Sequence, residues 1–323
     1  MLFVAVLIAS SVVMVAQELR LQDAGSSSAS LSASNLETAR LDPARRNALQ
    51  EAIKTRDYAR AETILAQEIE KNPKTPQLLT LLGSVFFLDG KYLNTAIAMK
   101  KAEAITPLDD PNRFTLALSY IILNHRDWAR PELEKLARSD PKNALYPYWL
   151  GRIEYDAMQF TAAIAHLQKT LELNPNFMKG YDNLALCYEA VGKYDEAIQT
   201  YKEAIRLNRQ KPVLSPWPPL NLATLLVKIG RLEEAETFLQ ESLRYDPRFP
   251  KAHYQMGLLL EKQSKDNEAI RELNEAAALD PTYPEPHYVL GKIYRRTGDP
   301  VKAEAAWATF QKLKKEKKDE RPH

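Results

Sequence analysis

Small and apolar residues return along this chain at one fixed interval. Alanines and prolines stand 34 residues apart in several series, which are Ala129, Ala163, Ala197; Ala235, Ala269, Ala303; Pro73, Pro107, Pro141, Pro175; and Pro247, Pro281. A period of this length is typical of one supersecondary unit that stacks on copies of itself. Between Ala197 and Ala235 the interval is 38, so four residues are inserted there without loss of phase. The pattern predicts a repeat protein.

Eight copies follow one another through residues 42–315, and they begin at Asp42, Pro76, Asp110, Ala144, Met178, Pro216, Pro250 and Pro284. The 24th residue of every copy is apolar, as in Met99 and Leu273. Eight of the ten glycines occupy two positions, the eighth (Gly83, Gly151, Gly257, Gly291) and the fifteenth (Gly90, Gly192, Gly230, Gly298). We expect the eighth to lie where two helices approach closely and the fifteenth to supply positive φ in a turn. Each copy is therefore predicted to be a pair of helices.

The residues at these positions resemble the tetratricopeptide repeat. The best copy is 178–211, "MKGYDNLALCYEAVGKYDEAIQTYKEAIRLNRQK", which lacks only the closing proline, replaced by Arg209. The first copy departs from the motif with Leu49 and Glu68 at positions that are normally small, as expected of a terminal repeat. The resemblance implies an all-α fold, a right-handed α-solenoid of antiparallel helix pairs with a long concave surface and no second domain of another fold.

The inserted residues 212–215 lie in a proline-rich stretch, "KPVLSPWPPLNL". Because the repeat phase is kept on both sides, we expect the insertion to lengthen one turn, stiffened by proline into an extended path. Two interpretations of Trp217 follow. It either plugs the seam between neighbouring copies or forms a lip on the concave groove.

The two ends of the chain differ from the repeats. Residues 1–16, "MLFVAVLIASSVVMVA", carry no charge and predict a signal peptide or a short membrane anchor, and residues 17–41 read as a Ser/Ala-rich linker. No Lys or Arg precedes the apolar run, so either the true start lies upstream or the segment is an uncleaved anchor. We expect a periplasmic or other extracytoplasmic protein that meets a membrane only through this segment. Residues 316–323 form a charged tail.

Composition and motifs argue against catalysis, metal binding and nucleic-acid binding. The net charge is +2, and Glu189, Glu261 and Glu285 interleave with the basic residues, so we expect no nucleic-acid partner. The chain has no nucleophile elbow, HExxH or phosphate-binding loop, and its single cysteine, Cys187, reads as a buried apolar residue. His253 and His287 share the fourth position of neighbouring copies, where a packing ring is expected rather than a metal ligand. The sequence predicts no enzyme, no cofactor and no metal.

The resemblance places the concave surface on positions 2, 5, 6, 9, 12 and 13 of each copy. Copies two to four contribute a mainly aromatic zone, with Phe87, Phe114, Leu118, Ile121, Tyr148, Trp149, Arg152 and Tyr155. Later copies contribute a polar and basic zone, with Lys179, Asn183, Trp217, Asn221, Lys228, Lys251, Tyr254, Gln255, Tyr288, Lys292 and Arg296. We expect the rings to be exposed and the two asparagines to hydrogen-bond the backbone of an extended peptide.

These residues favour a non-enzymatic adaptor or scaffold that binds an extended segment of another protein in its groove. The alternative is a scaffold in envelope or polysaccharide assembly, which contacts glycan through its rings or partners a separate glycosyltransferase. The family's clamp for acidic chaperone C-termini is not expected, because Asp182 and Leu186 stand where it needs Lys and Asn.

Overall fold

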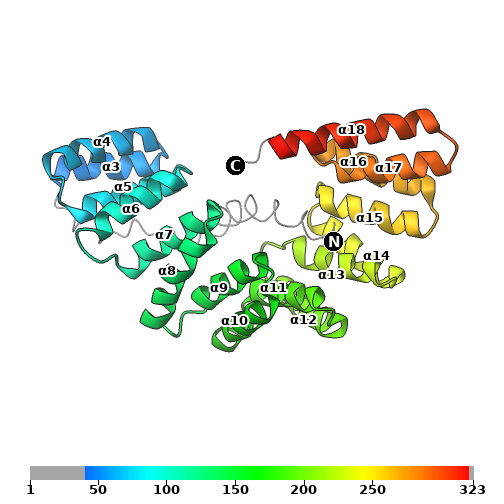
Figure 1. The fold of residues 1–323 in the computed structure, drawn as a ribbon, viewed down its shortest axis with the longest axis horizontal. Coiled ribbons are helices and arrows are strands. Elements are labelled where there is room, and N and C mark those ends of the chain that lie inside the picture. The colour runs from blue at the N-terminus through cyan, green and yellow to red at the C-terminus, as the bar shows by residue number, and fades with distance from the viewer. Residues whose placement is uncertain (1–40, 320–323) are drawn as a thin grey trace. The chain divides into compact units, whose positions relative to one another are not determined.

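The computed structural model describes residues 41–319, and every regular element among them is an α-helix (Figure 1). These residues divide into two compact units, residues 41–173 (unit 1) and residues 174–319 (unit 2). Both are built from antiparallel helical hairpins, so the predicted all-α solenoid fold is confirmed. No helix in the described part of the chain is both long and apolar enough to span a bilayer.

Each unit contains four hairpins. In unit 1 they are α3 (Pro43–Lys54) with α4 (Tyr58–Lys71), α5 (Pro76–Leu88) with α6 (Tyr92–Glu103), α7 (Asp110–Ile122) with α8 (Arg126–Ser139), and α9 (Leu145–Asp156) with α10 (Phe160–Leu173). In unit 2 they are α11 (Met178–Ala190) with α12 (Tyr194–Asn208), α13 (Trp217–Lys228) with α14 (Leu232–Tyr245), α15 (Pro250–Lys262) with α16 (Asp266–Leu279), and α17 (Glu285–Arg296) with α18 (Pro300–Asp319). In each hairpin, the helix that comes earlier in the sequence is called the first helix below, and the other is called the second helix.

Local sequence explains where several helices begin. The carboxylates of Asp42, Asp57 and Asp109 each accept a hydrogen bond from the backbone N–H three residues later, at 2.9 to 3.1 Å. Such a cap is worth about 1 kcal/mol, because it satisfies a donor that the helix itself leaves unpaired. Proline stands in the first turn of α3, α5, α7, α13, α15 and α17, where its missing N–H costs nothing.

Glycine at the eighth position lets the two helices of a hairpin touch. A Cβ added to Gly257 would lie 2.6 Å from Cγ of Leu273, and one added to Gly151 would lie 2.7 Å from Cγ of Leu167. Gly83 and Gly291 face Met99 and Trp307 in the same way. Each of these partners is the 24th residue of its copy, so the predicted close approach is confirmed and its contacting residue identified.

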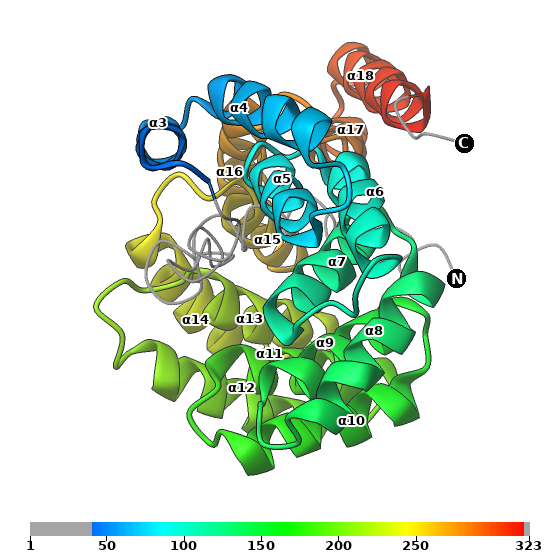
Figure 2. The ribbon, with the colours of Figure 1, turned by 90° about the vertical axis from the view of Figure 1, so that its left-hand side faces the viewer.

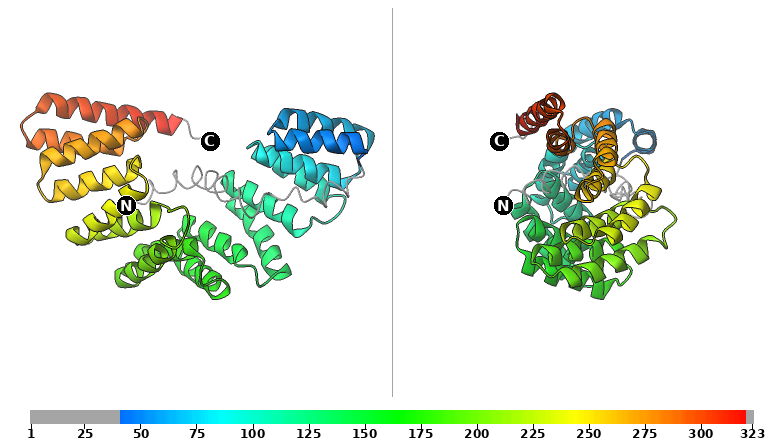
Figure 3. Two further views of the ribbon diagram at one scale, coloured as in Figure 1. Left: turned by 180° about the vertical axis from the view of Figure 1, so that it is seen from behind. Right: turned by 90° about the vertical axis from the view of Figure 1, so that its right-hand side faces the viewer.

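Neighbouring hairpins within a unit pack in a regular order. Each second helix contacts the first helix that follows it, as α4 contacts α5 and α14 contacts α15. First helices also contact one another, as α5 does α7 and α13 does α15. Figure 2 shows α3 to α8 following one another in unit 1, and Figure 3 shows the same succession from α13 to α18 in unit 2. In unit 2, where α11 contacts α13, α13 contacts α15 and α15 contacts α17, the first helices therefore form one continuous surface, the first-helix face.

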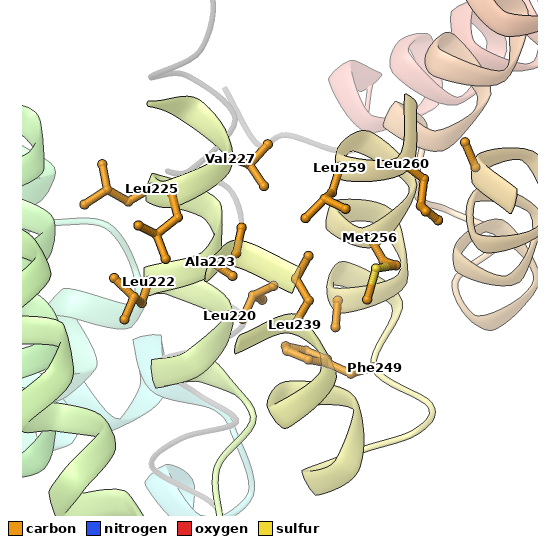
Figure 4. Packing of buried hydrophobic residues seen from close by; sticks show 14 of the residues in the cluster. Leu220, Leu222, Ala223, Leu225, Val227, Leu239, Phe249, Met256, Leu259 and Leu260 are labelled. Carbon is orange, nitrogen blue, oxygen red and sulfur yellow. The ribbon is translucent and has the colours of Figure 1, made fainter. Parts of the chain in front are cut away.

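The core of unit 2 runs through successive hairpins rather than closing around a centre. Figure 4 shows Leu222 and Leu225 of α13, Leu239 of α14, and Met256 and Leu259 of α15, which belong to one cluster of buried residues that extends from helix to helix. Leu222, Leu225, Leu239 and Leu259 are completely buried. Burying a leucine side chain contributes about 1.5–3 kcal/mol, so contact with the next hairpin supplies much of the stability of each copy.

The proline-rich stretch between α12 and α13 is fastened by buried polar groups. The side chain of Asn208 donates to the Ser215 carbonyl at 2.8 Å and accepts from the Ser215 N–H at 2.9 Å. The Ser242 hydroxyl donates to the Pro216 carbonyl at 2.9 Å. Val213, at the outer end of this stretch, is 81% exposed. The loop is thus held at its base while its apolar tip faces solvent.

Candidate functional site

The rings of unit 1 do not stand open as the sequence pattern predicted. Tyr148 and Trp149 are only 3% and 6% exposed, and their rings pack edge to face with centroids 5.4 Å apart. The Arg152 guanidinium, also buried, lies 5.9 Å from the Trp149 ring and donates to the Tyr148 hydroxyl at 3.3 Å. The expectation of exposure was wrong, because these two large rings, adjacent in sequence, bury more apolar area by packing than by facing water.

The remaining apolar residues of this zone also belong to the packing. Phe87, Phe114 and Tyr155 are half-buried, and each contacts a further ring edge-on, those of Tyr92, Tyr146 and Phe160 respectively. Leu118 and Ile121 are buried in the core of unit 1. The predicted aromatic zone is therefore largely structural.

The basic residues of unit 2 are mostly paired with carboxylates. At the carboxyl ends of its first helices, Lys228 of α13 donates to Glu189 of α11 at 2.9 Å. Lys292 and Arg296 of α17 both reach Glu261 of α15, at 3.4 and 3.3 Å. In each pair a cation meets the glutamate at position 12 of the preceding copy. This end of the first-helix face is consequently a ladder of ion pairs between copies.

The two asparagines predicted to bind a peptide have partners within the chain. Asn221 donates to both carboxylate oxygens of Asp182, at 3.1 and 3.0 Å, and so links α13 to α11. Asn183 is buried and donates to the carbonyl of Lys179 one turn earlier, at 2.8 Å. A peptide backbone would have to displace these bonds.

A different arrangement occurs at the amino end of the first-helix face of unit 2. The Lys251 ammonium group of α15 lies 4.7 Å from the centroid of the Trp217 ring of α13. Trp217 packs edge-on against Phe249, with centroids 4.9 Å apart, and Tyr254 packs against Tyr283 at 5.2 Å. These five residues are called the Lys251 cluster. The half-buried Trp217 thus sits in the seam between α13 and α15 while its face carries a cation.

Burial shapes the electrostatics of the Lys251 cluster. Burial is the main cause that lowers the pKa of Lys251, the Lys317 charge adds to it, and the charges of Asp280 and Glu285 oppose it. The ammonium group forms no hydrogen bond or ion pair with any described residue. Burial also raises the pKa of Tyr254 and of Tyr283, so both stay protonated. A cation held on an aromatic face without an acid partner is suited to receive an anionic group.

The other predicted residues of unit 2 lie on three of its first helices, α11, α15 and α17. Gln255 is half-buried on the same helix as Lys251, and Lys179 is half-buried at the start of α11. Tyr288 is 49% exposed and leans on Phe310 of α18 at 5.3 Å. Sequence reasoning missed Phe249 and Tyr283. Both stand directly before the first residue of a copy, so a repeated ring at that position was the available signal.

No metal centre is formed by the described residues, in which no three His, Cys, Asp or Glu side chains gather. His253 is engaged instead by Glu272, whose carboxylate lies 2.7 Å from Nδ1, and by the Pro247 carbonyl, 3.0 Å from Nε2. The glutamate hydrogen bond is the main cause that raises the pKa of His253. Its neighbour by position, His287, has a pKa lowered by burial.

Stacked hairpins with a continuous first-helix face define the chain as a helical-repeat protein of the α-solenoid class. Family models described as tetratricopeptide repeat match residues 47–110 and 188–259, and one described as TPR repeat matches residues 262–298. A further model, described as anaphase-promoting complex, cyclosome, subunit 3, matches residues 131–204. The chain belongs to the tetratricopeptide repeat proteins.

Curated relatives share the repeats over part of their length. The chain is 30% identical over 185 residues to the TPR repeat-containing protein YpiA of Bacillus subtilis, covering 56% of this chain and 42% of that protein. It is 33% identical over 105 residues to the cytochrome c-type biogenesis protein CycH of Rhizobium meliloti, covering 31% of this chain and 26% of that protein. The chain thus spans less than half of either relative.

Solved structures agree with the fold. A tetratricopeptide repeat protein from Parabacteroides merdae superposes with a TM-score of 0.62 at 18% identity, covering 76% of this chain and 94% of that one. PilW, a type IV pilus biogenesis factor, superposes with a TM-score of 0.57 at 19% identity, covering 62% and 92%. At such identities the likeness extends to the fold alone.

Proposed function

We propose that this protein is a non-enzymatic adaptor that binds an extended segment of a partner protein on the first-helix face of unit 2, at the Lys251 cluster. The observation that carries the proposal is the Lys251 ammonium group, which is packed on Trp217 and has no carboxylate partner. On the same face Lys228, Lys292 and Arg296 each have a carboxylate partner. An acidic residue of the bound segment would complete the missing pair.

The surroundings of Lys251 support a peptide ligand. The Trp217 and Tyr254 rings offer apolar area with polar tips, a combination enriched at protein interfaces. Tetratricopeptide repeat relatives include proteins named as members of assemblies, such as anaphase-promoting complex subunit 3 of Schizosaccharomyces pombe and the BBSome complex member BBS4 of Bos taurus. Both the family and the Lys251 cluster therefore favour a protein as the partner.

Selection from a peptide library on the purified chain tests the proposal. We expect the bound peptides to be extended and to share an acidic residue flanked by apolar ones. Lys251→Gln should weaken their binding about tenfold, the cost of one charge-assisted hydrogen bond in a partly buried site. Lys262→Gln is the matched control, because Lys262 lies on the same helix and is exposed. Equal binding by the Lys251→Gln variant would contradict the proposal.

The alternative, stacking of a glycan on a row of rings, draws no support from the rings of unit 1, because Tyr148 and Trp149 are buried.

Export remains part of our proposal. Residues 1–16, on which the signal-peptide or anchor prediction falls, lie outside the described residues. Sequencing the amino terminus of the mature protein from fractionated cells tests it, and a cytosolic chain with residues 1–16 intact would contradict it.

A further inference from the structure

A pocket of about 370 Å³ opens in unit 1 among α6, α7 and α8. It is lined by Lys100, Tyr120, Asp127, Trp128, Pro131 and Glu132, and it is called the Trp128 pocket below. Its volume lies in the range of sites that take a small ligand or a single large side chain. The lining combines two aromatic rings with charged groups.

Trp128 is the most unusual residue of the lining, because it is 54% exposed and yet firmly positioned. Its indole stacks on the His125 ring with centroids 4.2 Å apart and an interplanar angle of 13°. It also meets Tyr120 edge to face at 5.5 Å. An open indole that is already held in place loses little conformational entropy when a ligand packs on it.

Asp127, another residue of the lining, has two hydrogen-bond acceptors without a partner among the described residues. Its carboxylate forms no ion pair with any described residue. Pro131 lies four residues later inside α8 and has no N–H, so the Asp127 carbonyl lacks the donor that a regular helix would provide. A side-chain and a backbone acceptor therefore belong to the residue directly before Trp128 in the same lining.

The other charged groups of the lining already have ion-pair partners. Glu132 accepts from Lys135 at 3.0 Å and from Arg113, and Lys100 donates to Glu103 at 2.6 Å. Asp127 is thus the lining charge that a ligand would compensate. Its partner must be a cation.

We propose that the Trp128 pocket binds an arginine side chain of a partner protein. A guanidinium group is planar, so it stacks on an indole face, and its fork of N–H donors matches neighbouring acceptors such as the Asp127 carboxylate and carbonyl. The ammonium group of lysine is a compact point charge that cannot satisfy both contacts in the same plane. This site is independent of the Lys251 cluster, which is suited to an anion.

Nuclear magnetic resonance of the full chain with labelled tryptophan indoles tests this assignment, using the probe acetyl-Gly-Arg-Gly-amide. The Trp128 signal, identified by its loss in Trp128→Phe, should shift as the peptide is added. The peptide with citrulline in place of arginine has the same shape without the charge, and it should bind at least tenfold more weakly. Asp127→Asn should weaken the arginine peptide about tenfold, whereas Glu134→Gln, on the same helix but outside the pocket, should not.

Three results would overturn the proposal. They are a Trp128 signal that does not move at 20 mM peptide, an equal response to the citrulline peptide, and an equal response to the matched lysine peptide. The peptide comparisons use the unaltered protein, so they decide the matter even if Asp127→Asn were to unfold the hairpin.

Discussion

At the scale of single residues, one backbone conformation recurs in every hairpin. The residue at the fifteenth position has positive φ in all eight copies, between 58° and 84°. Four copies place glycine there, and the others place Arg56, Asn124, Met158 and Ser264. Outside glycine this conformation costs about 1–2 kcal/mol, with asparagine the best tolerated. The turn geometry is therefore dictated by the hairpin and merely eased by glycine.

Met158→Gly should stabilise the protein by about 0.5–1 kcal/mol, because glycine relieves the strain at φ 58° but loses more backbone entropy on folding. Gly192→Ala should destabilise it by about 1 kcal/mol. A Cβ at Gly192 meets no atom within 4 Å, so this change isolates the backbone effect. Urea unfolding of both variants measures the two changes in unfolding free energy, which should have opposite signs. Two changes of the same sign would refute the explanation.

The helical hairpin is the scale at which the glycines of the eighth position act. In Gly257→Ala the new methyl group would lie 2.6 Å from Leu273 Cγ, so α15 and α16 must separate or Leu273 must leave its rotamer. We expect a loss of about 1–3 kcal/mol, the usual cost of overpacking. The double variant with Leu273→Ala should lose less unfolding free energy than the sum of the losses in the two single variants, as measured by a double-mutant cycle. Strict additivity would show that the contact is not the cause.

The pair of His253 and Glu272 links α15 to α16 in a way that depends on pH. Because the folded-state pKa of His253 is raised above its unfolded value of about 6.5, its contribution is complete below that pH. It is then lost as the pH rises through the folded pKa. His287 has the opposite sign, since its lowered pKa makes the folded state less stable as the pH falls below about 6.5.

His253→Gln should therefore destabilise the chain more at pH 5.5 than at pH 8. The difference in unfolding free energy between variant and wild type, measured by urea titration at both values, isolates this histidine. A penalty that is the same at both values would mean that His253 contributes through packing alone.

At the scale of the whole molecule, stability passes from each hairpin to its neighbours. Contacts such as those of α14 with α15 and of α13 with α15 join one copy to the next, and the buried cluster of unit 2 runs through successive hairpins. Unfolding free energy in such an array depends on each hairpin and on its interfaces. A local defect should therefore weaken nearby hairpins first.

Hydrogen exchange can follow this propagation. In Gly257→Ala we expect faster amide exchange in α13 to α18, with the largest change in α15 and α16, while α3 to α6 should exchange as in the wild type. A uniform acceleration over all described helices would indicate that the chain unfolds as one cooperative body.

The sequence by itself determined the hairpin fold, because a fixed period of small and apolar residues leaves few ways to bury the two kinds of residue together. The close helix approach at Gly257 and the positive φ of Gly192 were readable from position alone, whereas Leu273 as the residue opposite Gly257 came from the structure. Which surface residues are available was not readable. Tyr148 and Asn221 share offsets with binding residues of the family, yet their partners here are Trp149 and Asp182. Such pairings depend on side chains brought together between helices, and so only the tertiary structure left Lys251 and Asp127 without a direct ion pair among the described residues.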